Sequence, residues 1–378
     1  MLEVTAMKTR SGAGIRRPTG PKRTTANRLR GRRRTGKKST PRQKRLGQTQ
    51  RKIQKVMRDL HPYWRAGRLA GSQFRADTHL PDKHASDAWC AYAANLPGLE
   101  NFETMLQAGN AFMQGYARSS GQSPEIVPLL LHRTAAAVVS ACNEESTLGH
   151  VLVQLKRLPL CDIVVVLNGT TDNSLERVLQ HSGITLVYEP NRAGHDVGRA
   201  LGAKMTHAEI VLFVDGDMIV PAEQLAPFLF AIDRGDDVAL NDLTSLLPPF
   251  AKQDEVSRIK AYLNRTLGRK DLASNSMTAV PHALSRRMIE TVKPSSLAVP
   301  PKAQMLAIQK GLQVSAPYQV DVIRSNRIRT GNTGHGNDVA RLILGDHLEA
   351  LAACLEKNKH AEHRRPSRTE VAYRRNAR

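Results

Sequence analysis

The chain has 378 residues and a formal net charge of +22, and 40% of its residues are hydrophobic. This length and apolar content are enough for a real buried core, which excludes a wholly disordered chain. The charge is uneven, because residues 1–60 hold 20 Lys and Arg against 2 acidic residues, and residues 356–378 hold 8 against 3. The body between these ends is close to neutral, so the basicity belongs to the ends.

Residues 1–60 are rich in Arg, Lys, Thr, Gly and Pro and poor in large apolar residues. Such a segment buries too little surface to offset its ordering entropy, so we expect a disordered basic arm. The arm is either a solvated tail or an electrostatic contact for an anionic polymer or membrane surface. It has no aromatic residue to stack on bases, so nothing in it indicates nucleic acid in particular. Residues 356–378 are expected to form a basic C-terminal tail.

Targeting and cysteine patterns are uninformative. No apolar run approaches the length of a membrane span, and none follows the basic start as a signal peptide requires. We therefore expect a cytoplasmic protein, with a peripheral position at the membrane left open. The four cysteines show no CxxC pairing, which predicts neither a disulfide framework nor a zinc site.

Two folded regions are expected between the ends. Residues 61–131 carry scattered aromatic residues and a helical pattern over 101–118, which predicts a small helical accessory region. Residues 132–355 are expected to form the main domain. A further helix is expected over residues 338–356.

The main domain begins with alternating strand and helix patterns. Continuous, β-branched apolar runs predict buried strands at 135–141, 162–167, 184–188 and 209–214. Helical spacings lie between them at 147–158, 174–181 and 197–206. This alternation predicts an α/β fold with a mostly parallel sheet and helices on both faces. Ligands of such sheets bind at the carboxyl ends of the strands.

Polar or glycine-containing loops follow all four predicted strands, at residues 142–145, 168–172, 191–196 and 215–217. The last is the most informative, because the apolar run ends in Asp215, Gly216 and Asp217. Two carboxylates at a strand end offer the oxygen ligands that Mg2+ or Mn2+ prefers. Gly216 is expected to let phosphate approach the backbone.

Four segments together resemble the successive signatures of family 2 glycosyltransferases with the GT-A fold: VVSACNEESTL, VVVLNGTTDNS, NRAGHDVGRALGAK and IVLFVDGDMIVP. The resemblance is strong over residues 134–242 and weak from there to about 355. It implies transfer of a sugar from a nucleoside diphosphate sugar, such as a UDP- or GDP-sugar, with Mn2+ or Mg2+ as cofactor. The acceptor, whether saccharide, lipid or small molecule, stays open.

The resemblance implies donor-binding roles for residues of the four loops and of the helix that follows the third loop. Glu144 would accept a hydrogen bond from a ribose hydroxyl. The alternative role of this loop is structural, with Asn143 and Glu145 capping the next helix. Asn168 stands where the family usually has Asp, so the identity of the donor's nucleobase stays open. Arg199 is the preferred cation for the diphosphate, and Lys204 is either a second cation or an exposed helix residue. The donor-binding set is Ala141, Asn143, Glu144, Asn168, Gly169, Asp172, Gly194, Arg199, Lys204 and Asp215.

The same resemblance assigns the metal. Asp217 would bind it directly, and Asp215 would contact the ribose or a metal-bound water. His335, in a glycine-rich loop, would be a further ligand, or else a surface histidine. The expected catalytic residues are therefore Asp215, Asp217 and His335.

The second half of the domain matches less well. Asn275, Ser276, Met277 and His282 are expected on the acceptor side. Inverting members usually carry a general-base carboxylate near the position that here reads Pro300, Pro301 and Lys302. Either the enzyme retains the anomeric configuration and needs no protein base, or the base comes from elsewhere, such as Asp242 or Asp271.

Two other functions remain open. An inactive GT-A domain could act as a scaffold whose basic arms dock on anionic polymer, and the absent base favours this reading. The intact Asp215 and Asp217 favour the enzyme. A nucleotidyltransferase would need a basic, glycine-rich loop after the first strand, and the acidic sequence CNEES there argues against it.

Overall fold

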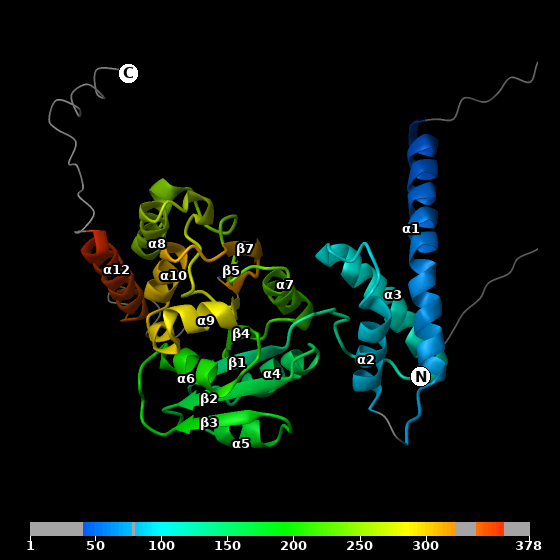
Figure 1. The fold of residues 1–378 in the computed structure, drawn as a ribbon, viewed down its shortest axis with the longest axis horizontal. Coiled ribbons are helices and arrows are strands. Elements are labelled where there is room, and N and C mark those ends of the chain that lie inside the picture. Colours follow the sequence, from blue (N-terminus) through cyan, green and yellow to red (C-terminus); the bar gives the residue numbers. More distant parts are fainter. Residues whose placement is uncertain (1–40, 78–79, 323–337, 359–378) are drawn as a thin grey trace, which may run out of the picture. The chain divides into compact units, whose positions relative to one another are not determined.

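The structure is a computed structural model that describes residues 41–77, 80–322 and 338–358. It contains an amino-terminal group of helices followed by an α/β domain (Figure 1). The helices are α1 (Pro41–Ser72), α2 (Pro81–Ala93), α3 (Phe102–Ser120), α4 (Leu148–Lys156), α5 (Ser174–Leu179), α6 (Val197–Met205), α7 (Ala222–Asp233), α8 (Glu255–Thr266), α9 (Arg286–Val292), α10 (Pro300–Gln309) and α12 (Asp338–Asn358). The strands are β1 (Ala135–Ala141), β2 (Asp162–Asn168), β3 (Thr185–Glu189), β4 (Ile210–Asp215), β5 (Val238–Asn241), β6 (His282–Ser285) and β7 (Val314–Tyr318). Short 3-10 helices are η1 (Phe250–Lys252), η2 (Lys270–Leu272) and η3 (Pro294–Ala298).

Helix α1 occupies part of the segment in which the sequence predicted disorder. We expected disorder up to residue 60, but helix α1 begins at Pro41 and continues to Ser72. Arg and Lys have good helix propensity, so a basic composition is compatible with a helix. Residues 1–40 and the tail beyond residue 358 lie outside the described residues. Residues up to Gln54 also form a unit separate from Lys55–Arg378.

The domain is built on one seven-stranded sheet with the order β3-β2-β1-β4-β6-β5-β7. Strands β1, β2, β3 and β4 pair in parallel, as predicted from the alternation of strands and helices. Strand β6 runs antiparallel to both neighbours, while β5 and β7 are parallel to each other. The register pairs Ser140 of β1 with Asp215 of β4, so these two strands end side by side.

Helices cover both faces of the sheet, also as predicted. On one face Val139 of β1 packs in a core with Leu152 of α4 and Leu229 of α7. On the other face Val138 packs in a second core with Ala203 of α6 and Met288 of α9. Because adjacent strand residues point to opposite faces, a continuous apolar run is what a sheet buried on both sides requires.

The region before β1 is helical, in agreement with the aromatic pattern. Helices α1 and α3 approach closely: a Cβ added at Gly67 would lie 1.9 Å from the carbonyl oxygen of Phe112, and one at Gly115 would lie 2.0 Å from that of Trp64. Trp89 of α2 packs against the Phe112 ring, with ring centroids 5.5 Å apart. Aromatic packing and glycine contacts therefore hold these helices together.

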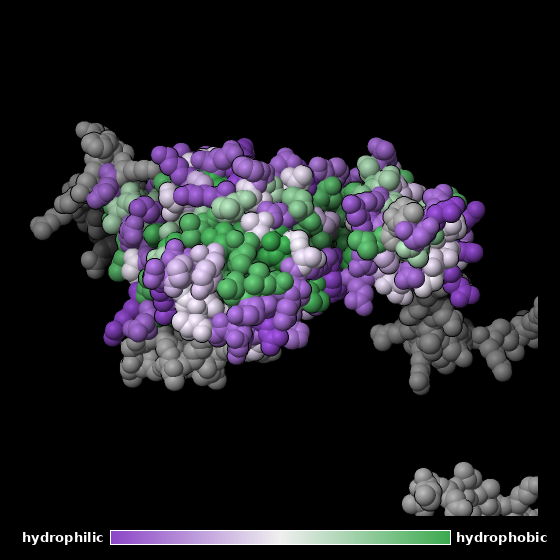
Figure 2. All heavy atoms as spheres, turned by 90° about the horizontal axis from the view of Figure 1, so that it is seen from below, coloured by the Kyte–Doolittle hydropathy of each residue, from purple (hydrophilic) through white to green (hydrophobic). Residues whose placement is uncertain are grey.

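Some apolar side chains reach the surface of the molecule. Figure 2 shows that they gather in one area of the face seen from below, with hydrophilic side chains around them. None of the helices in the described ranges combines the length and apolar content that crossing a bilayer requires.

Candidate active site

The loops after β1, β2, β3 and β4 meet around a cavity of about 110 Å3. Each loop contributes to the lining: Glu144 follows β1, Asn168 ends β2, His195 follows β3, and Asp217 follows β4. This convergence was expected, because parallel strands bring their carboxyl ends to one edge of the sheet. The enclosed volume is smaller than the roughly 300 Å3 of an ordinary small-molecule site, so it can surround only part of a nucleotide sugar.

The Asp215-Gly216-Asp217 turn is held against the end of β1. The amide of Gly216 donates to the Ser140 carbonyl oxygen at 2.8 Å, and the hydroxyl of Thr147 donates to the Gly216 carbonyl oxygen at 2.8 Å. A Cβ at Gly216 would lie 2.7 Å from the Cβ of Ala141. Close packing on β1 therefore requires this glycine, which is a different reason from the phosphate approach expected from the sequence.

Arg199, in the first turns of α6, is buried at the centre of the site. Its guanidinium lies 2.9 Å from Asp196 Oδ1 and 3.8 Å from Asp215 Oδ1. It also donates to the Met277 carbonyl oxygen at 3.1 Å. Burial raises the pKa of Asp215 above its ordinary value; Arg199 opposes the shift and Asp217 adds to it. Two carboxylates already share the arginine charge.

The side chain of Asn143 joins the first loop to the second. The backbone of Asn143 has a φ of 59°. The Asn143 Oδ1 accepts hydrogen bonds from the backbone amides of Thr171 and Asp172 at 2.7 and 3.3 Å. Asp172 in turn accepts from the Ser174 hydroxyl at 2.6 Å and from the Glu145 amide at 3.0 Å. Burial opposes ionisation of Asp172, but these hydrogen bonds outweigh it and place its pKa below the ordinary value.

Helix α4 does not use the caps that the sequence suggested. Its N-cap residue is Thr147, without a side-chain capping bond, and Glu145 instead accepts a hydrogen bond from the Asn173 amide at 3.2 Å. Glu144 is buried and lines the cavity. Asn143 and Glu145 therefore hold the loops together, while the ribose contact of Glu144 stays a prediction.

Asn168 holds the third loop in place. Its Nδ2 donates to the Gly194 carbonyl oxygen at 2.6 Å, and its Oδ1 accepts from the Ala193 amide at 2.9 Å. Gly169 has a φ of 69°, and a Cβ there would lie 3.0 Å from that of Arg192. The amide oxygen expected to read a base thus already has a backbone donor.

Helix α6 packs closely on the sheet through two glycines. A Cβ at Gly198 would lie 2.8 Å from Ser140 Oγ, and one at Gly202 would lie 2.3 Å from a methyl carbon of Val138. Lys204 is exposed in the last turn of this helix and does not line the cavity. Of the two cations weighed from the sequence, Arg199 alone reaches the site.

The four residues expected on the acceptor side are buried and hydrogen-bonded within the protein. Asn275 Nδ2 donates to Asp242 Oδ1 at 3.0 Å, and Ser276 Oγ lies 3.4 Å from His347 Nε2. The Met277 amide donates to Gln304 Oε1 at 2.8 Å. None of the four lines the strand-end cavity, and their acceptor role stays a prediction.

His282 is part of the core. Its ring stacks on Phe213 with centroids 5.1 Å apart, and Nδ1 lies 3.0 Å from the Ala279 carbonyl oxygen. Burial, with the nearby Arg199, lowers its pKa to about 3. This histidine is therefore neutral at physiological pH and packs as an aromatic residue.

The alternative bases are also engaged. Asp271 forms an ion pair with Arg269 at 2.6 Å, and Asp242 accepts from Asn275 and from the Thr244 amide. Pro300 begins helix α10, where a general-base carboxylate would be expected. Neither Asp242 nor Asp271 lines the strand-end cavity. His335 lies outside the described residues.

Several residues near the site were not predicted from the sequence. Ser140 and His195 line the cavity, and the hydroxyl of Ser140 is buried without a hydrogen-bond partner among the described residues. Burial lowers the pKa of Lys260, near Arg199, to about 8. Burial, with Asp196 and Glu349 nearby, raises the pKa of Asp346 to about 6. His195 could have been found from the third motif, but Lys260 and Asp346 lie in ordinary helical patterns.

Comparison with known proteins gives a family and several similar structures. The family described as Glycosyl transferase family 2 matches residues 136–288. Glucosyl-3-phosphoglycerate synthase from Mycobacterium tuberculosis, in complex with Mn2+, uridine-diphosphate and phosphoglyceric acid, is 18% identical with a TM-score of 0.44, over 58% of this chain and 78% of that chain. A structure described as a mycobacterial protein is 19% identical with a TM-score of 0.44, over 58% and 76%. No curated protein matches the chain.

The family match extends from β1 into α9 and so includes all four loops around the cavity. It agrees with the resemblance carried by the four sequence motifs and with the mostly parallel sheet. Residues 136–288 therefore match glycosyl transferase family 2, in agreement with the four sequence motifs.

Proposed function

We propose that this enzyme moves a sugar from a nucleoside diphosphate sugar to an acceptor hydroxyl, with a divalent cation held at Asp217. The observation that carries the proposal is the position of Asp215 and Asp217 at the end of β4, inside the ring of loops and beside Arg199. A donor with a uridine or guanosine base fits the family, and Asn168 leaves that choice open.

The residues present fit a magnesium or manganese ion. Both cations accept carboxylate oxygens and complete their shells with water and phosphate. Burial and the Asp217 charge raise the pKa of Asp215, so this pair gains from additional positive charge. Within the described ranges no three His, Cys, Asp or Glu residues form a metal-binding group, so these residues supply a partial shell. When bound, the cation would stabilise the diphosphate as a leaving group.

The side chains around the cation have separate tasks. Arg199 orients Asp215 and places positive charge near the diphosphate. Glu144 lines the same cavity and would accept a hydrogen bond from a ribose hydroxyl. Because no carboxylate opens α10, we favour a retaining reaction in which the donor phosphate helps to remove the acceptor proton.

A donor screen tests the proposal. Thermal unfolding is measured with UDP- and GDP-sugars, with and without Mn2+, for the wild type, Asp217→Ala and the control Glu176→Ala, which changes an exposed acid of α5. We expect one donor class to raise the melting temperature in Mn2+ for the wild type and the control. Asp217→Ala should lose this metal-dependent increase.

Two outcomes would contradict the proposal. If Asp217→Ala keeps the full increase, the metal is bound elsewhere. If no nucleotide sugar stabilises the wild type, the catalytically inactive scaffold becomes the better reading, and the basic ends become the place to look for function.

A further inference from the structure

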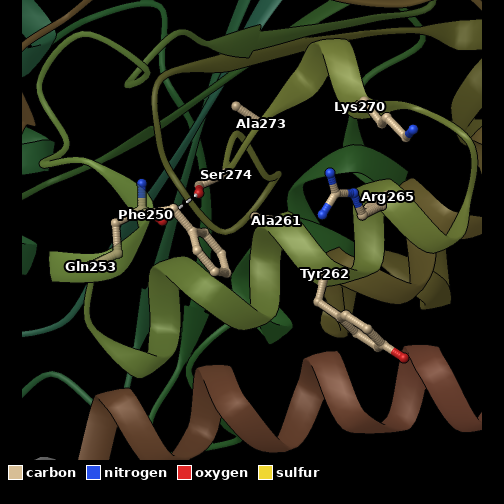
Figure 3. A pocket seen from close by; sticks show the side chains of 8 residues that line it. All are labelled: Phe250, Gln253, Ala261, Tyr262, Arg265, Lys270, Ala273 and Ser274. Carbon is tan, nitrogen blue, oxygen red and sulfur yellow. Dashed lines mark hydrogen bonds between the residues drawn. The ribbon is translucent and has the colours of Figure 1, made fainter. Parts of the chain in front are cut away.

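A second cavity, of about 450 Å3, lies beside helix α8. This volume is within the range of roughly 300–1,000 Å3 found for small-molecule sites. Its walls come from η1, α8, η2 and the segment after η2, as Figure 3 shows. We call it the α8 pocket; the side chains that matter for its chemistry are Phe250, Gln253, Tyr262, Arg265, Lys270 and Ser274.

The α8 pocket has an excess of positive charge. Arg265 and Lys270 line it, and no acidic side chain does. Within the described part of the chain neither cation has an ion-pair partner. Two acids near these cations in sequence are engaged elsewhere, because Asp254 accepts from the Ser257 amide at 2.7 Å and Asp271 is paired with Arg269. A ligand with an anionic group would therefore complete this site.

The pocket also offers apolar ring surfaces. Phe250 is 62% exposed and Tyr262 is 60% exposed, which is unusual for large aromatic residues. In Figure 3 the Phe250 ring and the Arg265 guanidinium group lie on two sides of the pocket. The Arg258 guanidinium lies over the Phe250 ring, 5.9 Å from its centroid, so a sugar would pack on the remaining ring surface. Arg265 and Lys270 provide donors for an anion.

Polar groups hold the pocket wall in position. The Ser274 hydroxyl donates to the Ser257 carbonyl oxygen at 2.9 Å, and Gln253 Nε2 donates to the Pro248 carbonyl oxygen at 3.0 Å. Asn264 on the inner side of α8 donates to the carbonyl oxygens of Ala273 and Asn275 at 3.0 and 2.9 Å. The pocket is thus part of the packed structure of the domain.

The pocket is close to the strand-end cavity along the chain. Ser274 lines the pocket, and Met277, three residues later, accepts a hydrogen bond from Arg199. Three residues span at most about 11 Å. Ser274 and Met277 therefore belong to one short segment that borders both the α8 pocket and Arg199.

We propose that the α8 pocket binds the phosphate end of a phosphorylated sugar acceptor, with Arg265 and Lys270 on the phosphate and Phe250 against the sugar ring. This proposal rests on the proposed function, because it supplies that reaction with an acceptor class. Its test uses binding without donor or metal, so it can fail while the donor screen succeeds, and the reverse.

Isothermal titration calorimetry measures binding of glucose 6-phosphate and mannose 6-phosphate, with glucose, inorganic phosphate and UMP as comparison ligands. We expect at least one sugar phosphate to bind tighter than all three comparison ligands. The double variant Arg265→Gln/Lys270→Gln should weaken its binding about tenfold or more, as expected for losing charge-assisted hydrogen bonds. The control Arg177→Gln changes an exposed arginine of α5 and should leave it unchanged.

Phe250→Ala distinguishes the contribution of the aromatic ring to binding from that of the groups that bind the phosphate. It should weaken sugar phosphate binding and leave the binding of inorganic phosphate unchanged. Sugar phosphates that bind no tighter than inorganic phosphate, or equally tight binding by the double variant, would overturn the proposal. Tighter binding of UMP would also overturn it, because the pocket would then be a nucleotide site.

Discussion

The two halves of the sheet use similar polar residues in different ways. In the half formed by β1, β2, β3 and β4, the polar residues after each strand line one cavity. In the half formed by β5, β6 and β7, Asn275, Ser276 and His282 are buried and bonded within the protein. Parallel strands in chain order bring consecutive loops together, whereas the antiparallel β6 and its long connections bury the polar segments between helices.

Two asparagines show the contrast most directly. Asn168 and Asn275 are both buried, and both use their amide groups on neighbouring backbone or side chains. Only Asn168 also lines the strand-end cavity. A polar residue in a family-like segment therefore predicts a binding role only where the topology leaves one side of it open.

The largest effect should come from the buried charge that joins the two halves. Arg199→Met would leave Asp196 without its partner and remove the hydrogen bond to Met277. Removing one partner of a buried ion pair costs about 3–5 kcal/mol. Urea unfolding measures the loss, and Arg177→Met, at an exposed site, should change stability by only about 0.5 kcal/mol. A small change in Arg199→Met would mean that water reaches Asp196.

Acid should destabilise the second half through two buried histidines. Burial lowers the pKa of His282 to about 3 and that of His347 to about 4. The unfolded chain binds protons near pH 6.5 and the folded chain does not, so stability falls as pH drops below 6.5. From pH 7 to pH 5 each histidine should cost about 2 kcal/mol.

Unfolding curves at several pH values test this slope. His282→Phe keeps a ring against Phe213 and should reduce the pH dependence, whatever its effect on stability at neutral pH. His150→Phe, at an exposed position of α4, should leave the slope as it is. An unchanged slope in His282→Phe would show that this histidine is not the group that titrates.

Two glycine substitutions should act in opposite directions. Gly202→Ala places a Cβ 2.3 Å from a Val138 methyl carbon in the first half, and overpacking of this kind costs about 1–3 kcal/mol. Gly345→Ala in α12 meets no atom within 4 Å and should stabilise the helix by about 0.5–1 kcal/mol. Thermal unfolding gives both values, and a stabilising Gly202→Ala would contradict the close packing of α6.

The smallest effect is expected at Lys204. Its side chain is exposed and away from the cavity, so Lys204→Ala should leave donor turnover within about twofold of the wild type, as surface substitutions usually do. Steady-state kinetics checks this. A much larger decrease would show that Lys204 contacts the donor and would extend the site along α6.

Local sequence patterns determined the strands and helices of the first half and the loops that meet at the site. Apolar runs, glycines and the Asp215–Asp217 pair are adjacent in the chain, and their structural consequences depend on neighbours a few residues away. The family followed from the order of these motifs. The sequence predicted disorder up to residue 60, whereas helix α1 begins at Pro41. A basic composition does not by itself prevent helix formation.

Only the tertiary structure decided which polar groups remain available to a ligand. Asn275 meets Asp242, His347 meets Ser276 and Arg199 meets Met277 across 33 to 78 residues of chain. Gly216 is required by Ala141, which belongs to another strand. These partners are chosen by strand order and helix packing. No local pattern could therefore show that the expected acceptor residues already have hydrogen-bond partners, or that Arg265 and Lys270 of the α8 pocket have no ion-pair partner in the described part of the chain.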